Sequence, residues 1–524
     1  MDNEIAADLD ADVLVIGAGP VGLTTALLLA QWDLSVIVVE RRTSRSVAPK
    51  AHVINPRSLE IYAHLGLSID ELRRHATLGS DDKVSRFVSR LAARDYGSVP
   101  FEEQDQTHTP YPRMNLAQPR LEDILRDRLA ITPGLELRQG VTWISSFTEA
   151  DVVTSVTAAE DGTETTIRTS FVVAADGANS PVRRSLGIEM TGAPDTIPCV
   201  AITFQAGWRD LVADRPAMFY WAVGPQRPGV FLAYDIDQTW AYFILGAPEL
   251  PSEAECREIV VDAVGTPAAF DITHISSWDM TAQVADRFRE GRIFLAGDAA
   301  HRFPPSGGLG LNTGIQDAHN LAWKIAAISQ GWGDDALLDT YDSERRPVAE
   351  VNTAQSMKNA EAMIGLLDLK ETASQDTVDI AVAEGYDAFN SLGMQLGYSY
   401  GPDAAPLTVS TFTPTGRPGD RMPHAWLRDG GEQRSTLDLL SPTRHSLLTF
   451  DPSAWSGLSG HVSVVGLDVL SVPDEWRSLV RLKTGSALLV RPDGHIVEIV
   501  ADGDHAALDR LLGAAALRRG AARA

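Results

Sequence analysis

Short apolar stretches along the chain alternate with amphipathic patterns, and glycines stand at many of the junctions. Near the N-terminus the apolar stretch Asp12–Ile16 leads through a glycine-rich turn into a helical pattern over Leu23–Gln31, and a second apolar stretch, Leu34–Val39, follows. Phe171–Ala175 and Ile293–Ala296 are further buried-strand patterns. Strands that alternate with helices form parallel sheets, so the sequence predicts an α/β fold with a Rossmann-type domain.

The pattern changes between Gly192 and Met280, where segments rich in aromatic residues alternate between apolar and polar positions. This period of two predicts antiparallel strands in one sheet, over Cys199–Phe204, Ala217–Val223, Gly229–Ile236 and Thr239–Leu245. About half of the aromatic side chains in such strands should face each side of the sheet. Tyr220, Tyr234 and Tyr242 are our candidates to line an aromatic pocket for a substrate, and the alternative is that each belongs to the sheet core.

The last part of the chain predicts long helices and then a separate unit. Helical patterns extend from Ile315 to about Gln330 and over Tyr341–Lys370, and the stretch Gly401–Pro423, rich in proline, glycine and threonine, predicts a linker. Strand patterns and a helix from Ala506 follow it. The predicted division is a Rossmann-type domain in two parts, residues 1–190 and 281–400, an inserted antiparallel-sheet domain over residues 191–280, and a C-terminal unit over residues 401–524.

Composition and charge exclude several classes of function. Hydrophobic residues at 44% and charged residues at 22% are ordinary for a globular protein, and a net charge of −25 argues against nucleic acid or an anionic membrane as partner. The acidic N-terminus and the glycine-interrupted apolar run after it predict neither a signal peptide nor a membrane span. Cys199 and Cys256 form no CxxC, so we expect no disulfide framework, no thiolate metal site and a cytoplasmic location.

The turn after the first predicted strand has the spacing G-x-G-x-x-G, with Gly17, Gly19 and Gly22, and Glu40 ends the next strand. In this context Gly17 permits the tight turn, Gly19 the close approach of a pyrophosphate and Gly22 the packing of helix on strand. Glu40 would bind the ribose hydroxyls of an adenosine and repel a 2′-phosphate. The sequence therefore predicts a dinucleotide site for FAD or NAD rather than NADP.

A second glycine-rich loop, GDAAHRFPPSGGLGLNTG, follows the strand pattern Ile293–Ala296. Prolines fix φ and glycines let a flat ligand touch the backbone, so Pro304–Gly310 should form a stiff wall for a flavin ring. Asn312 or Thr313 is the predicted N-cap of the next helix, whose N-terminus would face the negative charge of a reduced flavin. The candidate contacts are Gly297, Asp298 as acceptor for the ribityl chain, Pro305, Gly308 and Gly310, and the alternative is an ordinary loop before a capped helix.

A locally basic stretch follows the first two strands and includes Arg41 and Lys50. It either contacts the phosphates of FAD or of a nicotinamide cofactor, or forms a solvated loop. His52 comes just after it and titrates near neutrality in its unperturbed form, so it could accept a phenolic proton. The alternative is that His52 makes hydrogen bonds within its loop and takes no part in a reaction.

Gln118 and Asp176 stand at the ends of further predicted elements. Gln118 begins a helical pattern, where it could reach the polar edge of a ligand or act as a cap. Asp176 closes the strand Phe171–Ala175, at the edge of the sheet where open α/β sheets place ligand contacts, and Arg183 lies on the helix that follows.

Together, GAGPVG with its acid, Gln118, DGANS and GDAAHRFPPSGGLGLNTGIQDAHNLAWK resemble the class A flavoprotein monooxygenases, the family of p-hydroxybenzoate and phenol hydroxylases. The resemblance covers roughly residues 10–400. The tail from about residue 405 resembles the redox-inactive thioredoxin-like domain of the phenol and polyketide hydroxylases, and without a CxxC its role should be structural or in association. A homodimer is the assembly that we expect.

The resemblance implies that FAD binds along these motifs and that NADPH or NADH reduces it transiently. The resemblance implies that the adenosine half of FAD contacts Gly17, Gly19, Gly22 and Glu40, and that the middle of the cofactor contacts Gln118 and Asp298. It implies that the isoalloxazine contacts Leu311 and Asn312, and that both FAD and NAD(P)H contact Asp176 and Arg183. Pro305 resembles the family's proline beside the flavin C4a, where the hydroperoxide forms. Lys50 stands where many members have arginine.

The implied activity is hydroxylation of a small aromatic substrate, a phenolic or polyketide ring, with oxygen from O₂ through that flavin hydroperoxide. His52 lies near the position of the phenol hydroxylases' substrate-deprotonating aspartate, which makes it the candidate base. Three alternatives stay open: a flavin-dependent reductase, a halogenase, and a flavin-bound sensor or interaction protein.

Overall fold

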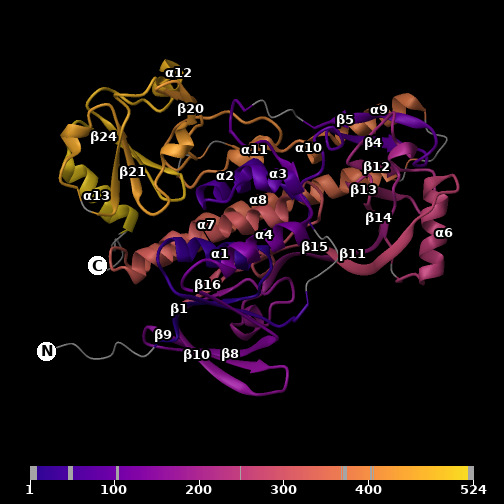
Figure 1. Cartoon of the computed structure of the whole chain (residues 1–524), viewed down its shortest axis with the longest axis horizontal. Coiled ribbons are helices and arrows are strands. Elements are labelled where there is room, and N and C mark those ends of the chain that lie inside the picture. The colour runs from indigo at the N-terminus through magenta and orange to yellow at the C-terminus, as the bar shows by residue number, and fades with distance from the viewer. Residues whose placement is uncertain are drawn as a thin grey trace.

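Two large sheets and one small C-terminal sheet surround two long helices, α7 (Leu309–Ser329) and α8 (Asp335–Leu367), in the computed structural model (Figure 1). The structure describes residues 9–44, 51–101, 106–247, 249–367, 369, 374–401, 404, 406–458 and 460–516. Within these ranges, none of the helices combines the length and the apolar character that a membrane crossing requires.

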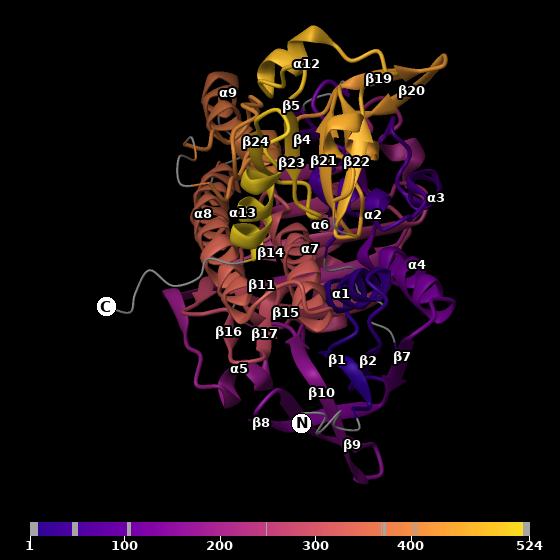
Figure 2. The same ribbon diagram turned by 90° about the vertical axis from the view of Figure 1, so that its left-hand side faces the viewer.

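The first sheet is built around parallel strands and confirms the predicted α/β fold. Its strand order is β16 (Arg289–Glu290), β17 (Ile293–Leu295), β10 (Glu164–Ala174), β1 (Ala11–Ile16), β2 (Val36–Glu40) and β7 (Leu135–Gln139). All neighbouring strands in this order are parallel except β16 and β17. β10 also pairs with β9 (Val152–Ala159), which forms an antiparallel ribbon with β8 (Val141–Glu149) at the bottom of Figure 2. The central strand β1 is almost wholly apolar and buried, as a strand between two others requires.

The second sheet has eight strands and is mainly antiparallel. Its order is β18 (His301–Arg302), β15 (Asp271–Ala285), β11 (Met190–Gln205), β14 (Thr239–Leu245), β13 (Gly229–Asp235), β12 (Phe219–Ala222), β4 (Val84–Val88) and β5 (Asp95–Pro100). β4 and β5 come from the range assigned to the first domain part, and β4 pairs in parallel with β12, where the Trp221 indole N–H donates to Ser85 Oγ at 2.9 Å. The sheet therefore reaches beyond residues 191–280, and the division of the chain into domains stays a prediction.

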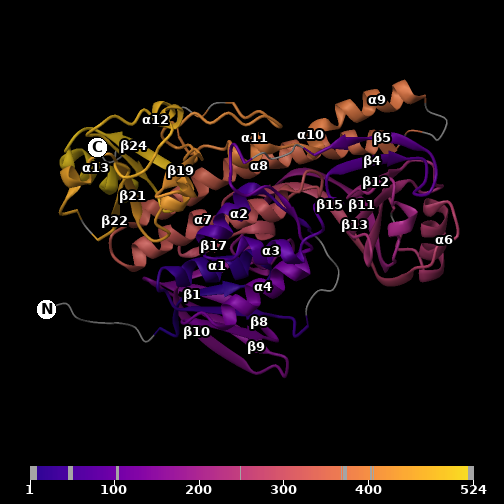
Figure 3. The ribbon, with the colours of Figure 1, turned by 45° about the horizontal axis from the view of Figure 1, so that its top comes forward.

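Helices cover both faces of the second sheet. On one face α6 (Glu253–Val264) packs against the sheet through Cys256 and Val260, and on the other α8, α9 (Gln375–Glu384) and α10 (Tyr386–Phe389) lie over β4, β5 and β12 (Figure 3). The remaining elements are α1 (Pro20–Gln31), β3 (Val53–Ile54), α2 (Pro56–His64), α3 (Ile69–His75), β6 (Met114–Asn115), α4 (Gln118–Ala130), α5 (Pro181–Ser185) and α11 (Leu392–Leu396).

The C-terminal unit has a sheet of order β22 (Val462–Gly466), β21 (His445–Thr449), β23 (Ala487–Val490) and β24 (Ile496–Val500). β21 is parallel to β22 and antiparallel to β23, and β24 is antiparallel to β23. With α12 (Asp474–Leu479) and α13 (His505–Ala516), this is the arrangement expected of a thioredoxin-like domain, and a hairpin of β19 (Trp426–Asp429) and β20 (Glu432–Ser435) is added to it.

Buried charges join the C-terminal unit to the rest of the molecule. Glu60 on α2 accepts from Arg57 Nη1 at 3.0 Å and from Arg421 Nε at 2.8 Å, and all three side chains are at most 5% exposed. Burial alone would raise the pKa of Glu60, but the two guanidinium groups bring it below its usual value. Glu344 on α8 forms a second such centre with Lys324 and Arg491, each at 2.7 Å.

Candidate functional site

The turn after β1 has the shape of a cradle for a pyrophosphate. Gly17 has φ +103°, and a Cβ there would lie 2.4 Å from Ala175 O, while a Cβ on Gly22 would lie 1.9 Å from Gly17 O. A Cβ on Gly19 would meet no atom of the described chain within 4 Å. Gly17 and Gly22 are therefore required by the fold, whereas the open space at Gly19 leaves room for a ligand at the N-terminus of α1, where backbone N–H groups favour an anion.

Glu40 ends β2 beside this turn, as the sequence predicted. Its Oε2 accepts from Ala18 N at 2.8 Å and its Oε1 from Arg42 N at 3.0 Å. One carboxylate thus fixes the glycine turn. Arg41 is exposed, and Lys50 lies outside the described residues.

Arg126 on α4 is a residue of this site that the sequence did not reveal. Its Nη2 donates to Ala18 O at 3.0 Å, and its Nε is buried with no hydrogen-bond partner in the described part of the chain. A cation beside the glycine turn would suit a pyrophosphate. Nothing in the local sequence marks it, because α4 reaches the turn only through the tertiary fold.

Gln118 and Asp298 lie on different elements near the middle of the predicted cofactor path. Gln118 is the first residue of α4, where its side chain donates to Glu122 Oε1 at 2.7 Å and its backbone N–H donates to Ala51 O at 2.8 Å. Asp298 is exposed on a short 3-10 turn, Gly297–Ala299. The bond to Glu122 uses one N–H of the Gln118 amide, so its oxygen and its second N–H could still bind a ligand.

Asp176 and Arg183 lie where β10 ends. Asp176 Oδ1 is buried and has no hydrogen-bond partner among the described residues, and burial raises the pKa of this carboxyl. An acceptor in this state fits a ligand hydroxyl or a bound water. Arg183 donates from Nη1 to Ala299 O at 2.9 Å and to Ala178 O at 3.3 Å, so it ties the turn of Asp298 to the loop after β10.

Helix α7, which follows the predicted flavin wall, begins earlier in the chain than expected. The helix starts at Leu309 and its N-cap is Gly308, with φ +63°, so the prediction of an N-cap at Asn312 or Thr313 was wrong. Glycine can take the left-handed conformation that this start of the helix requires, and no side chain caps the helix. Thr313 instead donates back to Leu309 O at 2.8 Å.

The wall itself is open where a flat ligand would need it. Pro305 is exposed, and a Cβ on Gly310 would approach only Phe303, at 3.8 Å. Leu311 is half-buried. Asn312 is buried, donates to Val53 O at 2.9 Å and accepts from Asn55 N at 3.0 Å, so its side chain holds β3 and α2 against α7.

His52 lies next to this wall and against an aromatic cluster. A Cβ on Gly308 would be 3.4 Å from the Cβ of Val53, the neighbour of His52. The His52 ring is edge-on to Phe219 at 5.5 Å and to Tyr234 at 5.6 Å between ring centroids. We call the aromatic cluster the four rings Phe101, Phe219, Tyr234 and Phe389, which belong to one apolar cluster. Within it, the Phe101 ring contacts Phe219 and Phe389, and the His52 ring contacts Phe219 and Tyr234.

A hydrogen-bond chain fixes the ring of His52. Its Nδ1 is 2.9 Å from Asn115 Oδ1, the Asn115 amide donates to Thr77 Oγ1 at 2.9 Å, and Thr77 donates to Tyr234 O at 2.6 Å. Because Asn115 presents its oxygen, Nδ1 is the donor and Nε2 is left as an acceptor. Burial lowers the pKa of His52 to about 4, with a smaller lowering from Arg113, against the hydrogen bond to Asn115.

The three candidate tyrosines do not share one face of the second sheet. Tyr220 and Tyr242 pair across the sheet through Phe231 and pack with α6, and their hydroxyls bond to Arg215 O and Arg227 O. Tyr234 alone lies on the face of His52 and the aromatic cluster. The expected grouping of Tyr220 and Tyr242 with a substrate pocket therefore loses its geometric basis, because alternate positions of a strand face opposite sides.

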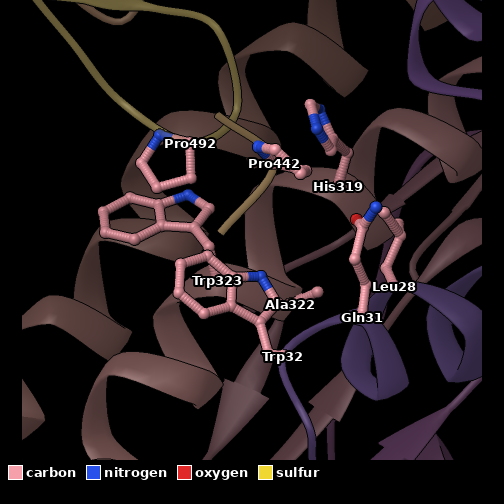
Figure 4. Close-up of a pocket in the computed structure, with 8 residues that line it drawn as sticks. All are labelled: Leu28, Gln31, Trp32, His319, Ala322, Trp323, Pro442 and Pro492. Atoms are coloured by element: carbon pink, nitrogen blue, oxygen red, sulfur yellow. The ribbon is translucent and has the colours of Figure 1, made fainter. Parts of the chain in front are cut away.

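A separate cavity lies between α1, α7 and the C-terminal unit (Figure 4). Its volume of about 10 Å³ is room for about one water molecule, so it is not a cofactor site. It is lined by Leu28, Gln31, Trp32, His319, Ala322, Trp323, Pro442 and Pro492. Across the described ranges, no group of histidine, cysteine and acidic residues could hold a metal ion.

Comparisons with known proteins agree over nearly the whole chain. Residues 10–356 match the model of an FAD binding domain, and residues 415–515 match the model of an aromatic-ring hydroxylase C-terminal domain. A putative polyketide hydroxylase of Streptomyces halstedii is 34% identical and covers 92% of each chain, and the tetracenomycin B2 monooxygenase-dioxygenase of Streptomyces olivaceus is 33% identical, over 96% of this chain and 98% of the relative. The flavin-dependent monooxygenase PieE, solved with FAD and substrate, superposes with a TM-score of 0.87 at 29% identity, over 97% of this chain and 99% of that one.

Proposed function

The chain belongs to the FAD-binding aromatic-ring hydroxylases, and from this premise we propose that it transfers one oxygen atom of O₂ to a phenolic or polyketide aromatic ring at the expense of NADPH or NADH. The matches confirm the resemblance, the FAD cofactor and the class of enzyme that the sequence predicted. A homodimer and a cytoplasmic location stay predictions from the sequence alone.

The proposal rests chiefly on one juxtaposition, in which His52 and the aromatic cluster stand beside the flavin wall. Val53 touches the wall at Gly308 and also packs against the aromatic cluster. Apolar, aromatic surroundings suit a flat aromatic substrate and would exclude water from the reacting centre. A ring held there would lie next to the edge of a flavin seated on the wall.

The residues have distinct tasks in this proposal. Bound FAD would supply the storage of electrons from NAD(P)H and the activation of O₂. The cradle at Gly19 with Arg126 would hold the pyrophosphate, Glu40 the ribose and Asp298 the ribityl chain. His52 Nε2 would accept the hydrogen of a substrate hydroxyl, which orients the ring and raises its electron density.

The function is tested with purified protein, FAD, NADPH or NADH and a panel of phenols and aromatic polyketides. We expect substrate to accelerate oxidation of the nicotinamide and a product that is one oxygen heavier, with the isotope label of ¹⁸O₂ and not of H₂¹⁸O. Oxidation without a heavier product would favour a reductase. Stable FAD binding without oxidation under any substrate would favour a sensor.

Replacing His52 by alanine is expected to lower turnover by about 10²- to 10⁴-fold and to leave FAD binding unchanged. Since burial holds the pKa of His52 near 4, the ring of the wild type is neutral above that pH and stays an acceptor. Below its pKa it would gain a proton, so its contribution is present above pH 4 and is lost as pH falls through about 4.

The measurement is a pH profile of turnover for the wild type and for His52→Ala. A wild-type inflection near 6.5 that disappears in the variant would show that the ring titrates like an exposed histidine. Equal turnover of the two proteins at every pH would remove His52 from the mechanism. Asn115→Leu, which removes the hydrogen-bond partner of His52 Nδ1, is expected to lose less turnover than His52→Ala does.

A further inference from the structure

Asp317 is a carboxylate that the proposed function does not use, although it is wholly buried beneath the flavin wall. It lies on α7, and its side chain is 0% exposed. Its Oδ2 accepts from His301 Nε2 at 2.7 Å and from Gly297 N at 3.2 Å, and its Oδ1 accepts from Arg345 Nε at 2.8 Å. A buried carboxylate is stable only with such donors, and each of these comes from a different element.

Two of the three donors belong to segments that shape the wall. Gly297 immediately precedes Asp298, the candidate ribityl contact. His301 on β18 stacks on Phe303 with ring centroids 4.7 Å apart, and Phe303 is the side chain nearest to the open face of Gly310. The other nitrogen of His301, Nδ1, is buried with no hydrogen-bond partner in the described ranges, so Asp317 is the group that orients this ring.

The third donor connects the carboxylate to the long helix behind the wall. Arg345 on α8 is 0% exposed and also donates from Nη2 to Thr313 O at 3.2 Å, in the second turn of α7. Arg345 Nη1 donates to the hydroxyl of Tyr400 at 3.1 Å. One buried carboxylate therefore sets α7, α8, β18 and the turn of Gly297 relative to one another.

We propose that Asp317 is a positioning residue of the flavin site, which fixes the segment that leads into the wall by holding Gly297 and His301 against α7. The inference rests on the proposed FAD site. Loss of its charge would let the turn of Asp298 and the ring pair His301–Phe303 shift independently. FAD would then bind more weakly, and the flavin and the substrate ring would no longer be held in register.

The test replaces Asp317 by asparagine, which keeps the volume and removes the charge. We expect the Kd for FAD to rise about tenfold or more, the visible absorption bands of the bound flavin to shift, and a larger share of NAD(P)H to be oxidised without ring hydroxylation. His301→Phe is the second variant, because it keeps a ring to stack on Phe303 but loses the donor to Asp317. It is expected to change the same three quantities in the same direction, whether or not Asp317→Asn folds.

Glu344→Gln is the matched control. Glu344 is also a carboxylate on the α7–α8 contact with two cationic partners, although its side chain is 14% exposed. Its partner Lys324 lies seven residues, about two turns, beyond Asp317 on α7. It is expected to lower the thermal transition and to keep the wild-type Kd for FAD and the wild-type flavin spectrum. If Asp317→Asn or His301→Phe behaves like this control, the positioning role is overturned.

The outcome separates this inference from the proposed function. A wild-type protein that binds FAD but hydroxylates no ring would overturn the proposed activity, while the Kd and the flavin spectrum of the variants would still decide the role of Asp317. A wild-type protein that takes up no FAD would overturn both.

Discussion

Replacing Gly19 by valine is expected to weaken FAD binding strongly while the protein folds as before. The backbone of Gly19 has φ −76° and ψ 179°, an extended conformation that valine adopts without strain. A Cβ at this position meets nothing of the described chain within 4 Å, so we expect the side chain to point into the space predicted for the pyrophosphate. We expect the affinity for FAD to fall by about a hundredfold or more, equal to about 3 kcal/mol.

Two neighbouring glycines provide the contrast. Alanine at Gly17 would combine an unfavourable φ of +103° with a clash against Ala175 O, and alanine at Gly22 would clash with Gly17 O. Both variants should lose stability as well as FAD. Flavin absorbance per protein, circular dichroism and the thermal transition separate the two classes. A Gly19→Val protein that carries a full complement of FAD would show that the cofactor does not lie in this cradle.

Replacing Glu60 by leucine is expected to destabilise the docking of the C-terminal unit by about 3–5 kcal/mol. The change leaves the guanidinium groups of Arg57 and Arg421 buried and facing each other without a counter-charge. Arg57 also donates to Asp493 O at 2.6 Å, so the cluster joins α2 directly to the turn between β23 and β24. The free energy of unfolding, followed by chemical denaturation of the whole chain, measures the loss.

The matched variant replaces the three charges together, with Arg57→Met, Glu60→Leu and Arg421→Met. Apolar side chains of similar volume often substitute for a buried ion cluster with little loss, so this triple variant should recover most of the stability. If the single and the triple variants were equally stable, the cluster would contribute nothing through its charges. If Glu60→Leu lost no stability, the charge of Glu60 would contribute nothing to the docking of the C-terminal unit.

The first sheet and the glycine turn could be predicted because their signals are local. The apolar stretches that became β1 and β2 are buried on both faces, and the spacing of Gly17, Gly19 and Gly22 leaves few alternatives for the turn between β1 and α1. The glycine- and proline-rich loop before α7 was recognised as a loop that leads into a helix for the same reason. The first residue of α7 was not predicted, because the helix follows a left-handed Gly308 and lacks the side-chain cap that a helix start usually carries.

The parts that could not be predicted depend on pairing over long sequence distances. No local pattern shows that β4 pairs with β12, that Arg126 reaches Ala18 O, or that Asp317 collects donors from three elements. The same limit applies to the tyrosines. A period of two tells which residues of a strand share a face of the sheet. It does not tell that one face packs against helix α6 and that the other faces His52.

Strand β4 comes from the range assigned to the first domain part but pairs with β12 in the second sheet, and this pairing also affects how the chain folds during synthesis. β4 leaves the ribosome long before its partner β12. In the first sheet, β10 likewise remains without its neighbour β17 until residues 293–295 have been synthesised. Contacts this far apart in sequence form slowly and leave unpaired strand edges open to aggregation. A nascent chain of this protein should therefore need chaperone protection until about residue 302 has emerged, where β18 completes the second sheet. A gene cut anywhere between β4 and β12 would yield two fragments that are each incomplete without the other.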